Sequence, residues 1–178
     1  MSFTEDTNWG KKFVTEAAQQ LASYSATMNY ESQAIAINSN AENIQSTGTK
    51  QCMINGVYIP VLAADAELDI SADTTTITGM TNAVGISIAD GYDQYFLILA
   101  KADGTLSMWK AGDAALLGTA TIKVPAYDPE TYVAVATALI VNNSGNALIV
   151  GTTALTGDIT FYNVIGPLYP HPDNLKRN

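Results

Sequence analysis

Short apolar runs separated by tight-turn dipeptides fill the chain from residue 51 onward, and this pattern restricts the fold more than any other feature. Asn55-Gly56 and Asp103-Gly104 each stand between two apolar runs. Such pairs are the strongest short-range hairpin signal, because both central residues of a type I′ turn need a positive φ. Turn signals recur about every 8 to 12 residues, as in antiparallel sandwiches and barrels. We therefore expect a mainly β fold, an antiparallel, jelly-roll-like β-sandwich or barrel with an N-terminal α-helix and an extended C-terminal tail.

The composition of the expected strands predicts different degrees of burial. Residues 94–102 are almost continuously apolar, which indicates a strand that is buried on both faces. Residues 113–117 interrupt the pattern and are compatible with a helical turn. The remaining expected strands are residues 52–54, 57–59, 85–89, 105–110, 120–124, 132–142, 147–150 and 158–164. Strands do not alternate with long helices, which argues against a parallel α/β sheet.

The first 50 residues have a different composition. Apolar residues recur there at steps of four, four, three and four, which draws one stripe along a helix. The stripe consists of Phe13, Ala17, Leu21, Tyr24 and Met28. Both an ordinary amphipathic helix packed on its own domain and a short coiled-coil segment fit this spacing. Residues 36–50 are rich in Asn, Ser and Thr, which is typical of a linker or an irregular extended segment.

The chain therefore divides into three segments. We expect an N-terminal helix and extended arm over residues 1–50, a β-sandwich body over residues 51–165 and a Pro-rich tail over residues 166–178. Prolines in the tail remove backbone donors from any ladder and favour an extended arm of polyproline type. At roughly 150 residues per domain, the 178 residues make one domain with appendages.

The charge balance argues against two classes of partner. Lys and Arg total 8 against 17 Asp and Glu, so the net charge is -9. Nucleic-acid binders need clustered cations, and anionic membrane surfaces attract basic segments, so we expect neither partner. No apolar run approaches about 18 residues and no signal peptide is visible, so we expect no transmembrane helix and no secretion. We expect the chain to fold in a cytoplasm, which would keep the single thiol, Cys52, reduced.

Few side chains could carry chemistry, and for each we favour a structural role. Cys52 is the only cysteine and stands in apolar company, as buried cysteines do. His171 is the only histidine and lies between two prolines, a poor position for a catalytic base. Asp65, Glu67 and Asp69 share one face of a possible strand. That face could bind Ca²⁺ or supply paired glycosidase carboxylates, but we favour a plain solvent-facing surface.

Other motifs give no stronger signal for chemistry. Residues 90–93, Asp-Gly-Tyr-Asp, are closer to a calcium loop but fit a plain turn equally well. The sequence contains no phosphate-binding loop and no Gly-x-Ser-x-Gly elbow. We therefore expect a protein that is not an enzyme and that uses no metal or cofactor.

Several segments resemble a β module of tailed-bacteriophage virion structural proteins, of the head decoration or fibre type. The resemblance begins at Met53-Ile54-Asn55-Gly56-Val57-Tyr58, where an Asn-Gly hairpin precedes an Ala-rich segment and a strand at residues 63–68. It continues at residues 95–98, 103–105, 132–135, 141–145 and 151–155, and so covers residues 53–160. At residues 125–129 a short Pro-Ala-Tyr-Asp-Pro loop replaces a longer proline-containing loop. The resemblance implies a structural role in the virion and brings no catalytic residues with it.

The leading hypothesis is a capsid decoration, or cement, protein on the surface of the phage head. Its expected partners are itself, as a homotrimer, and the major capsid protein, contacted by the two ends of the chain. The expected oligomer or capsid interface residues are Trp9, Phe13, Leu21, Tyr24, Met28, Leu168 and Tyr169. Two alternatives stay open: a fibre, spike or tail-attached receptor binder that recognises a cell-surface glycan, and a glycan hydrolase with paired carboxylates.

Overall fold

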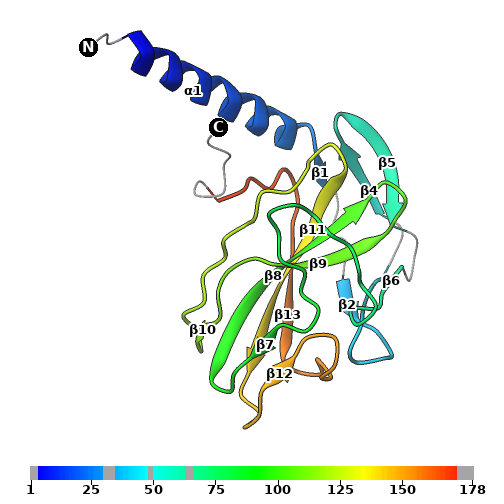
Figure 1. Cartoon of the computed structure of the whole chain (residues 1–178). Coiled ribbons are helices and arrows are strands. Elements are labelled where there is room, and N and C mark those ends of the chain that lie inside the picture. The colour runs from blue at the N-terminus through cyan, green and yellow to red at the C-terminus, as the bar shows by residue number, and fades with distance from the viewer. Residues whose placement is uncertain (1–3, 30–34, 48–49, 63–65, 172–178) are drawn as a thin grey trace.

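The computed structural model describes residues 4–29, 35–47, 50–62 and 66–171 of the chain. In this part the protein has one N-terminal helix followed by antiparallel sheets, which do not close into a barrel (Figure 1). The expected mainly β, sandwich-like fold is therefore confirmed, and the barrel alternative is wrong. The elements are α1 (Thr4–Ser25), β1 (Met28–Asn29), β2 (Ile35–Ile37), β3 (Ile44–Ser46), β4 (Lys50–Ile54), β5 (Val57–Leu62), β6 (Glu67–Leu68), β7 (Ser87–Ile88), β8 (Tyr92–Lys101), β9 (Leu106–Lys110), β10 (Ala115–Leu116), β11 (Tyr132–Asn142), β12 (Leu148–Ile149) and β13 (Ile159–Asn163).

The two longest strands, β8 and β11, form the centre of the largest sheet. They pair with each other, and the sheet continues through β13 beyond β11 and through β9 and β10 beyond β8. Every side chain of β8 from Phe96 to Ala100 is buried. Because both faces of the sheet are covered at β8 and β11, these two strands need no alternation of apolar and polar residues. The predicted burial of this strand on both faces is thus confirmed for its central part.

Three small sheets cover one face of the central sheet: β1-β4-β5, β2-β3-β6 and β12-β7. Ile35, Ile44 and Cys52 from these sheets pack with Phe96 of β8 in the larger hydrophobic core. The expectation of a linker or irregular segment over residues 36–50 is therefore wrong, because β2 and β3 pair there as an antiparallel hairpin. Strands this short have only one or two inward side chains, so the polar residues between them hid the pattern.

Long loops, the C-terminal segment and the end of the helix cover the opposite face. Leu97 and Leu99 of β8 and Trp109 of β9 form a second core with Val124 and Tyr127 of the long loop before β11. Figure 1 shows this loop in yellow-green, running from β10 past the central sheet toward the helix. The second core therefore brings the loop and the helix end together.

The loop across the second face departs from two expectations. Residues 113–117 contain strand β10 and no helical turn, and residues 120–124 form no strand. Asp93, buried at the start of β8, accepts the backbone N–H groups of Gly118 at 2.6 Å and Ala120 at 3.1 Å. These bonds fix the first part of the loop, and Val124 at its end packs in the second core.

The two hairpin signals give different turns. Asn55 and Gly56 have φ values of 49° and 75°, as the type I′ turn requires. In the second hairpin, Gly104 has a φ of 86° and its N–H donates to the Lys101 carbonyl, while Asp103 keeps an ordinary negative φ. This is the three-residue loop in which a type I turn ends in a left-handed glycine.

Candidate interaction site

Helix α1 joins the body at its C-terminal end and projects away from it (Figure 1). The side chains of this helix are described from Val14 to Ser25, and among them Tyr24 alone is fully buried, at 0% exposure. A helix that buries so little of itself on its own chain is stabilised mainly at its attachment. The attachment and the projecting part of the helix therefore form the candidate site.

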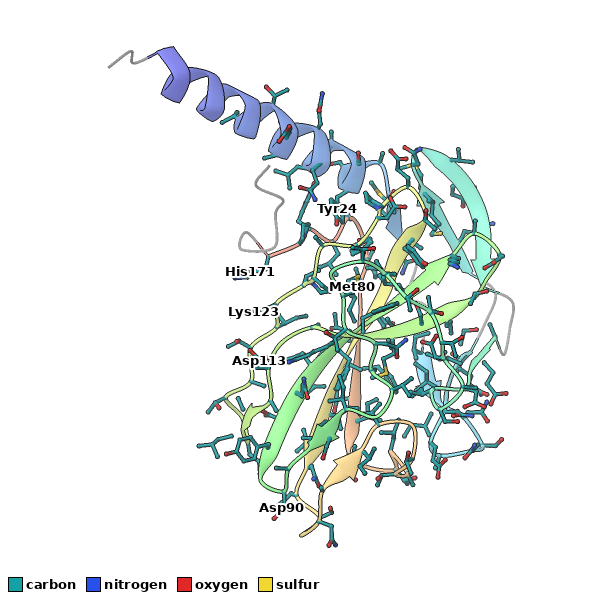
Figure 2. The ribbon with its side chains drawn as sticks, in the orientation of Figure 1. Tyr24, Met80, Asp90, Asp113, Lys123 and His171 are labelled. Atoms are coloured by element: carbon teal, nitrogen blue, oxygen red, sulfur yellow. The ribbon has the colours of Figure 1, made fainter. Side chains whose placement is uncertain are left out.

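Tyr24 packs against the loop that precedes β11 (Figure 2). Its ring meets the ring of Tyr127 edge to face, with the centroids 4.9 Å apart and the planes at 88°. Its hydroxyl donates to the Tyr127 carbonyl, and the Tyr127 hydroxyl donates to the Leu168 carbonyl at 3.2 Å. Burial raises the pKa of both tyrosines, so both hydroxyls remain protonated donors at neutral pH. The two rings thus connect the helix, the loop and the C-terminal tail.

The residues that follow the helix are held by the tip of the β4–β5 hairpin. The Gly56 N–H donates to the Ala26 carbonyl at 2.7 Å. The Thr27 hydroxyl accepts the Asn55 N–H at 2.9 Å and donates to the Pro129 carbonyl. Thr27 is 1% exposed, so these bonds are shielded from water. We call Tyr24, Thr27 and their bonded partners the helix anchor.

The described part of the tail, residues 166–171, lies along the body next to the helix anchor. The Gly166 N–H donates to the Asn29 carbonyl at 2.7 Å, and the His171 N–H donates to the Val124 carbonyl at 2.9 Å. The Tyr169 hydroxyl lies 2.9 Å from the Ser25 hydroxyl at the last helical residue. Residues 166–171 form no helix and no strand, and they pack on the body along this length.

The projecting helix turns its polar side toward the body and an apolar side toward solvent. Glu16, Gln20 and Ser23 line a cavity of about 540 Å³ between the helix and residues 77–78 and 126–130. On the other side Val14 is 65% exposed, Leu21 is 36% exposed and Ala18 between them is also exposed. Their spacing of four and three residues places them on one face. We call Val14, Ala18 and Leu21 the outer stripe.

Over residues 14–25 the helix therefore buries Tyr24 at its end but leaves this apolar face exposed, whereas the usual amphipathic helix turns its apolar side to the body. The stripe predicted from sequence periodicity included Leu21 but not Val14 or Ala18. The i, i+4, i+7 spacing of the outer stripe was the signal that could have identified them.

The predicted interface residues fall into separate environments. The side chains of Trp9 and Phe13 lie outside the part that the structure describes. Leu21 belongs to the outer stripe, and Tyr169 is 44% exposed beside the helix end. Leu168 is half-buried against the second core.

Two predicted interface residues need correction. Tyr24 is fully buried within its own chain, so its ring holds the helix and is not available to a partner in this arrangement. Met28 lies beyond the helix, which ends at Ser25. It pairs with Met53 in the β1–β4 ladder and is half-buried, so it is not part of a helical stripe.

The residues considered for chemistry occupy structural positions. Cys52 is fully buried, and burial raises the pKa of its thiol to about 12, which keeps it protonated. Asp90, at the end of the molecule far from the helix (Figure 2), accepts the Gly145 N–H at 2.8 Å and so closes a turn. His171 is half-buried at the tail and lies near Val124.

Residues 66–69 of the acidic segment line part of another cavity, of about 520 Å³. Asp65 lies outside the described residues. Glu67 accepts the Asn43 side-chain amide at 3.1 Å, and Asp69 accepts the Ser71 hydroxyl at 2.7 Å. Both carboxylates therefore accept hydrogen bonds from neighbouring side chains of their own chain. Within the described part of the chain, no three metal-ligating side chains come close enough together to hold an ion.

Comparison with protein-family models finds no match, and no curated protein or solved structure is significantly similar to the chain. Among the residues that the structure describes, no helix has the length and apolar character needed to cross a membrane.

Proposed function

We propose that this protein is a virion structural protein, a capsid decoration protein that binds and stabilises the head shell of a tailed bacteriophage as a homotrimer. The proposal joins the sequence resemblance over residues 53–160 to one observation, the outer stripe. Its partners are the major capsid protein and further copies of itself, and its location is the capsid surface.

The outer stripe carries the proposal because its exposure is unfavourable unless a partner covers it. Burial of apolar surface contributes roughly 25 cal/mol per Å², so a covered valine and leucine together supply several kcal/mol. The chain does not bury the outer stripe on its own body, because the helix side that faces the body carries Glu16, Gln20 and Ser23. A helix held by a buried anchor also loses less conformational freedom on binding than a free arm does.

One observation favours a second function, in which the body is a fibre, spike or tail-attached receptor binder. Tyr162 of β13 is 47% exposed, and its ring lies 6.5 Å from that of Tyr95 on the central sheet. An exposed tyrosine offers an apolar ring face together with a hydroxyl, which suits a cell-surface glycan. In this function the outer stripe would serve assembly and the tyrosine pair would contact the cell.

The test is binding of purified variants to undecorated capsids beside binding to host cells. Leu21→Glu places a charge in the outer stripe, and Gln19→Glu adds the same charge at an exposed position on the cavity side of the helix. We expect Leu21→Glu to reduce capsid binding about a hundredfold and Gln19→Glu to change it less than about threefold. Full capsid binding by Leu21→Glu would refute the proposal. Loss of cell binding by Tyr162→Ala, with no capsid binding by the unmodified chain, would support the receptor function instead.

Light scattering of the same proteins separates the two partners of the stripe. We expect the unmodified chain to be a trimer at tens of micromolar. If Leu21→Glu remains trimeric but loses the capsid, the outer stripe contacts the shell. If it becomes a monomer, the stripe is the seam between copies. A monomeric unmodified chain would contradict the trimer.

A further inference from the structure

We infer that the tail segment 166–171 is a clamp that sets the direction in which helix α1 leaves the body. It was expected to be an extended arm that serves a partner. Its contacts assign it a different task within its own chain, and this task does not depend on what the protein binds.

The clamp acts on the helix end directly and through Tyr127. Directly, the Tyr169 hydroxyl is 2.9 Å from the hydroxyl of Ser25. Indirectly, the Leu168 carbonyl accepts the hydroxyl of Tyr127, whose own carbonyl accepts the hydroxyl of Tyr24. Pro170 is buried, so the tail is seated on the body between these contacts and its next backbone bond at His171.

The other half of the attachment cannot by itself define a direction. The bonds of Ala26 and Thr27 to the β4–β5 turn lie beyond the last helical residue and hold the chain where the helix ends. Bonds gathered at one end of a rod fix its position but leave it free to tilt. The tail, drawn in red below the helix in Figure 1, adds a contact at Ser25, on the helix itself, and it holds Tyr127, which contacts Tyr24.

The length of the helix makes the direction sensitive to these few contacts. At 1.5 Å per residue, the 22 residues of α1 extend about 33 Å from the anchor. A tilt of about 10° at the base therefore displaces the far end by about 6 Å, more than the width of one side-chain contact. The same tilt moves Val14 of the outer stripe, 11 residues before the helix end, by about 3 Å, which is enough to disturb its fit against a partner surface.

One position in the tail allows the clamp to be disturbed by a substitution that does not change the helix. Gly166 has a φ of 90°, which L side chains rarely adopt, and this conformation turns the chain from β13 toward the helix end. A Cβ at this position would meet nothing within 4 Å, so a substitution there acts through backbone strain alone. Gly157, between β12 and β13, has a φ of 81° and equally open surroundings, and it is not among the residues of the helix anchor.

The experiment measures the distribution of distances between two spin labels on the full chain. The labels are attached to cysteines introduced by Thr15→Cys on the helix and Ala89→Cys on the body, both exposed positions. The labelled chain is diluted with unlabelled chain, so that only distances within one copy are measured. Buried Cys52 should stay unlabelled, which a count of two labels per chain verifies.

Two matched pairs of variants test the clamp. Tyr169→Ala removes the direct contact, and Tyr162→Ala removes a tyrosine of nearly equal exposure, 47% against 44%, that contacts Tyr95 instead of the helix. Gly166→Val disturbs the bend into the tail, and Gly157→Val applies the same strain elsewhere. We expect the first member of each pair to widen the distribution about twofold and its control to leave the width unchanged.

Equal widths for Tyr169→Ala and Tyr162→Ala would overturn the clamp. The tyrosine pair decides the question if a glycine variant fails to fold, because both tyrosines are exposed and their removal leaves the two cores intact. A widened distribution in both members of a pair would also count against the clamp, since it would reflect general loosening of the body.

Discussion

Replacing Tyr24 with alanine should release the helix from the body and leave the central sheet folded. Tyr24 packs only in the second core, with Tyr127 and the residues around it, while the larger core lies on the other face of the central sheet. The substitution therefore removes the part of the anchor that touches the helix itself. It leaves in place the packing that holds β8 and β11 together.

The magnitude follows from burial and bonding. Truncation of a fully buried aromatic side chain to alanine costs roughly 3 to 5 kcal/mol. Tyr24→Phe keeps the ring at 4.9 Å from Tyr127 and removes the hydroxyl that donates to the Tyr127 carbonyl. The loss of that buried bond should cost about 1 to 2 kcal/mol. Because the helix can detach locally, the global free energy of unfolding falls by no more than the docking energy.

Amide hydrogen exchange distinguishes local release from global unfolding. The reporter is the Gly56 N–H, which donates to the Ala26 carbonyl in the native state. A loss of about 3 kcal/mol corresponds to roughly a hundredfold faster exchange, and about 1.4 kcal/mol to tenfold. We expect these two changes for Tyr24→Ala and Tyr24→Phe, with unchanged exchange in β8 and β11.

Tyr162→Ala, at an exposed tyrosine, is the matched control and should leave the Gly56 amide unchanged. Undiminished protection of Gly56 in Tyr24→Ala would refute the role of Tyr24 as an anchor. An equal loss of protection throughout the central sheet would refute the independence of the two cores.

Two further predictions concern the body. Burial raises the pKa of the Cys52 thiol from 9.0 to about 12, so folding favours the protonated thiol and this stabilisation, complete below pH 9, is lost as the pH rises toward 12. Between pH 7 and about pH 10.5, the free energy of unfolding in urea should fall by about 2 kcal/mol more for the unmodified chain than for Cys52→Ala. An equal fall for the two proteins would contradict this. A Cβ on Gly112 would lie 2.4 Å from the Thr121 carbonyl oxygen, whereas one on Gly118 would meet nothing within 4 Å. Gly112→Ala should therefore lower the urea midpoint clearly more than Gly118→Ala, which carries only backbone strain of about 1 to 2 kcal/mol, and equal midpoints would contradict the close contact.

The centre of the fold could be predicted because its signals are local. Residues 132–142 form β11 with the expected bounds, since a long β-branched run between turn residues has few other stable conformations. The turn at Asn55 and Gly56 could also be predicted, because these two residue types favour the positive φ that the turn requires. In both cases the residues that decide the structure are neighbours in the chain.

The loop over the second core could not be predicted in the same way. Residues 120–124 alternate like a strand, yet the Lys123 N–H donates to the Ala111 carbonyl and Asp93 takes the N–H groups of Gly118 and Ala120. A buried carboxylate that accepts two backbone donors outcompetes a short edge ladder, and its partners lie more than 20 positions away in the sequence. Local alternation carries no information about such a competitor.

The direction of the helix could not be predicted from sequence periodicity, for a related reason. A stripe indicates which residues share a face of a helix, but the face that meets the body is chosen by contacts elsewhere in the chain. Here the deciding contact joins Tyr24 to Tyr127, 103 positions apart, and the tail supports it from the far end of the sequence. Among the described helical side chains, Tyr24 is therefore the one that the body buries completely. Because Val14 and Leu21 stay exposed on a helix whose polar side faces inward, the same contacts that attach the helix also determine which surface it offers to a partner.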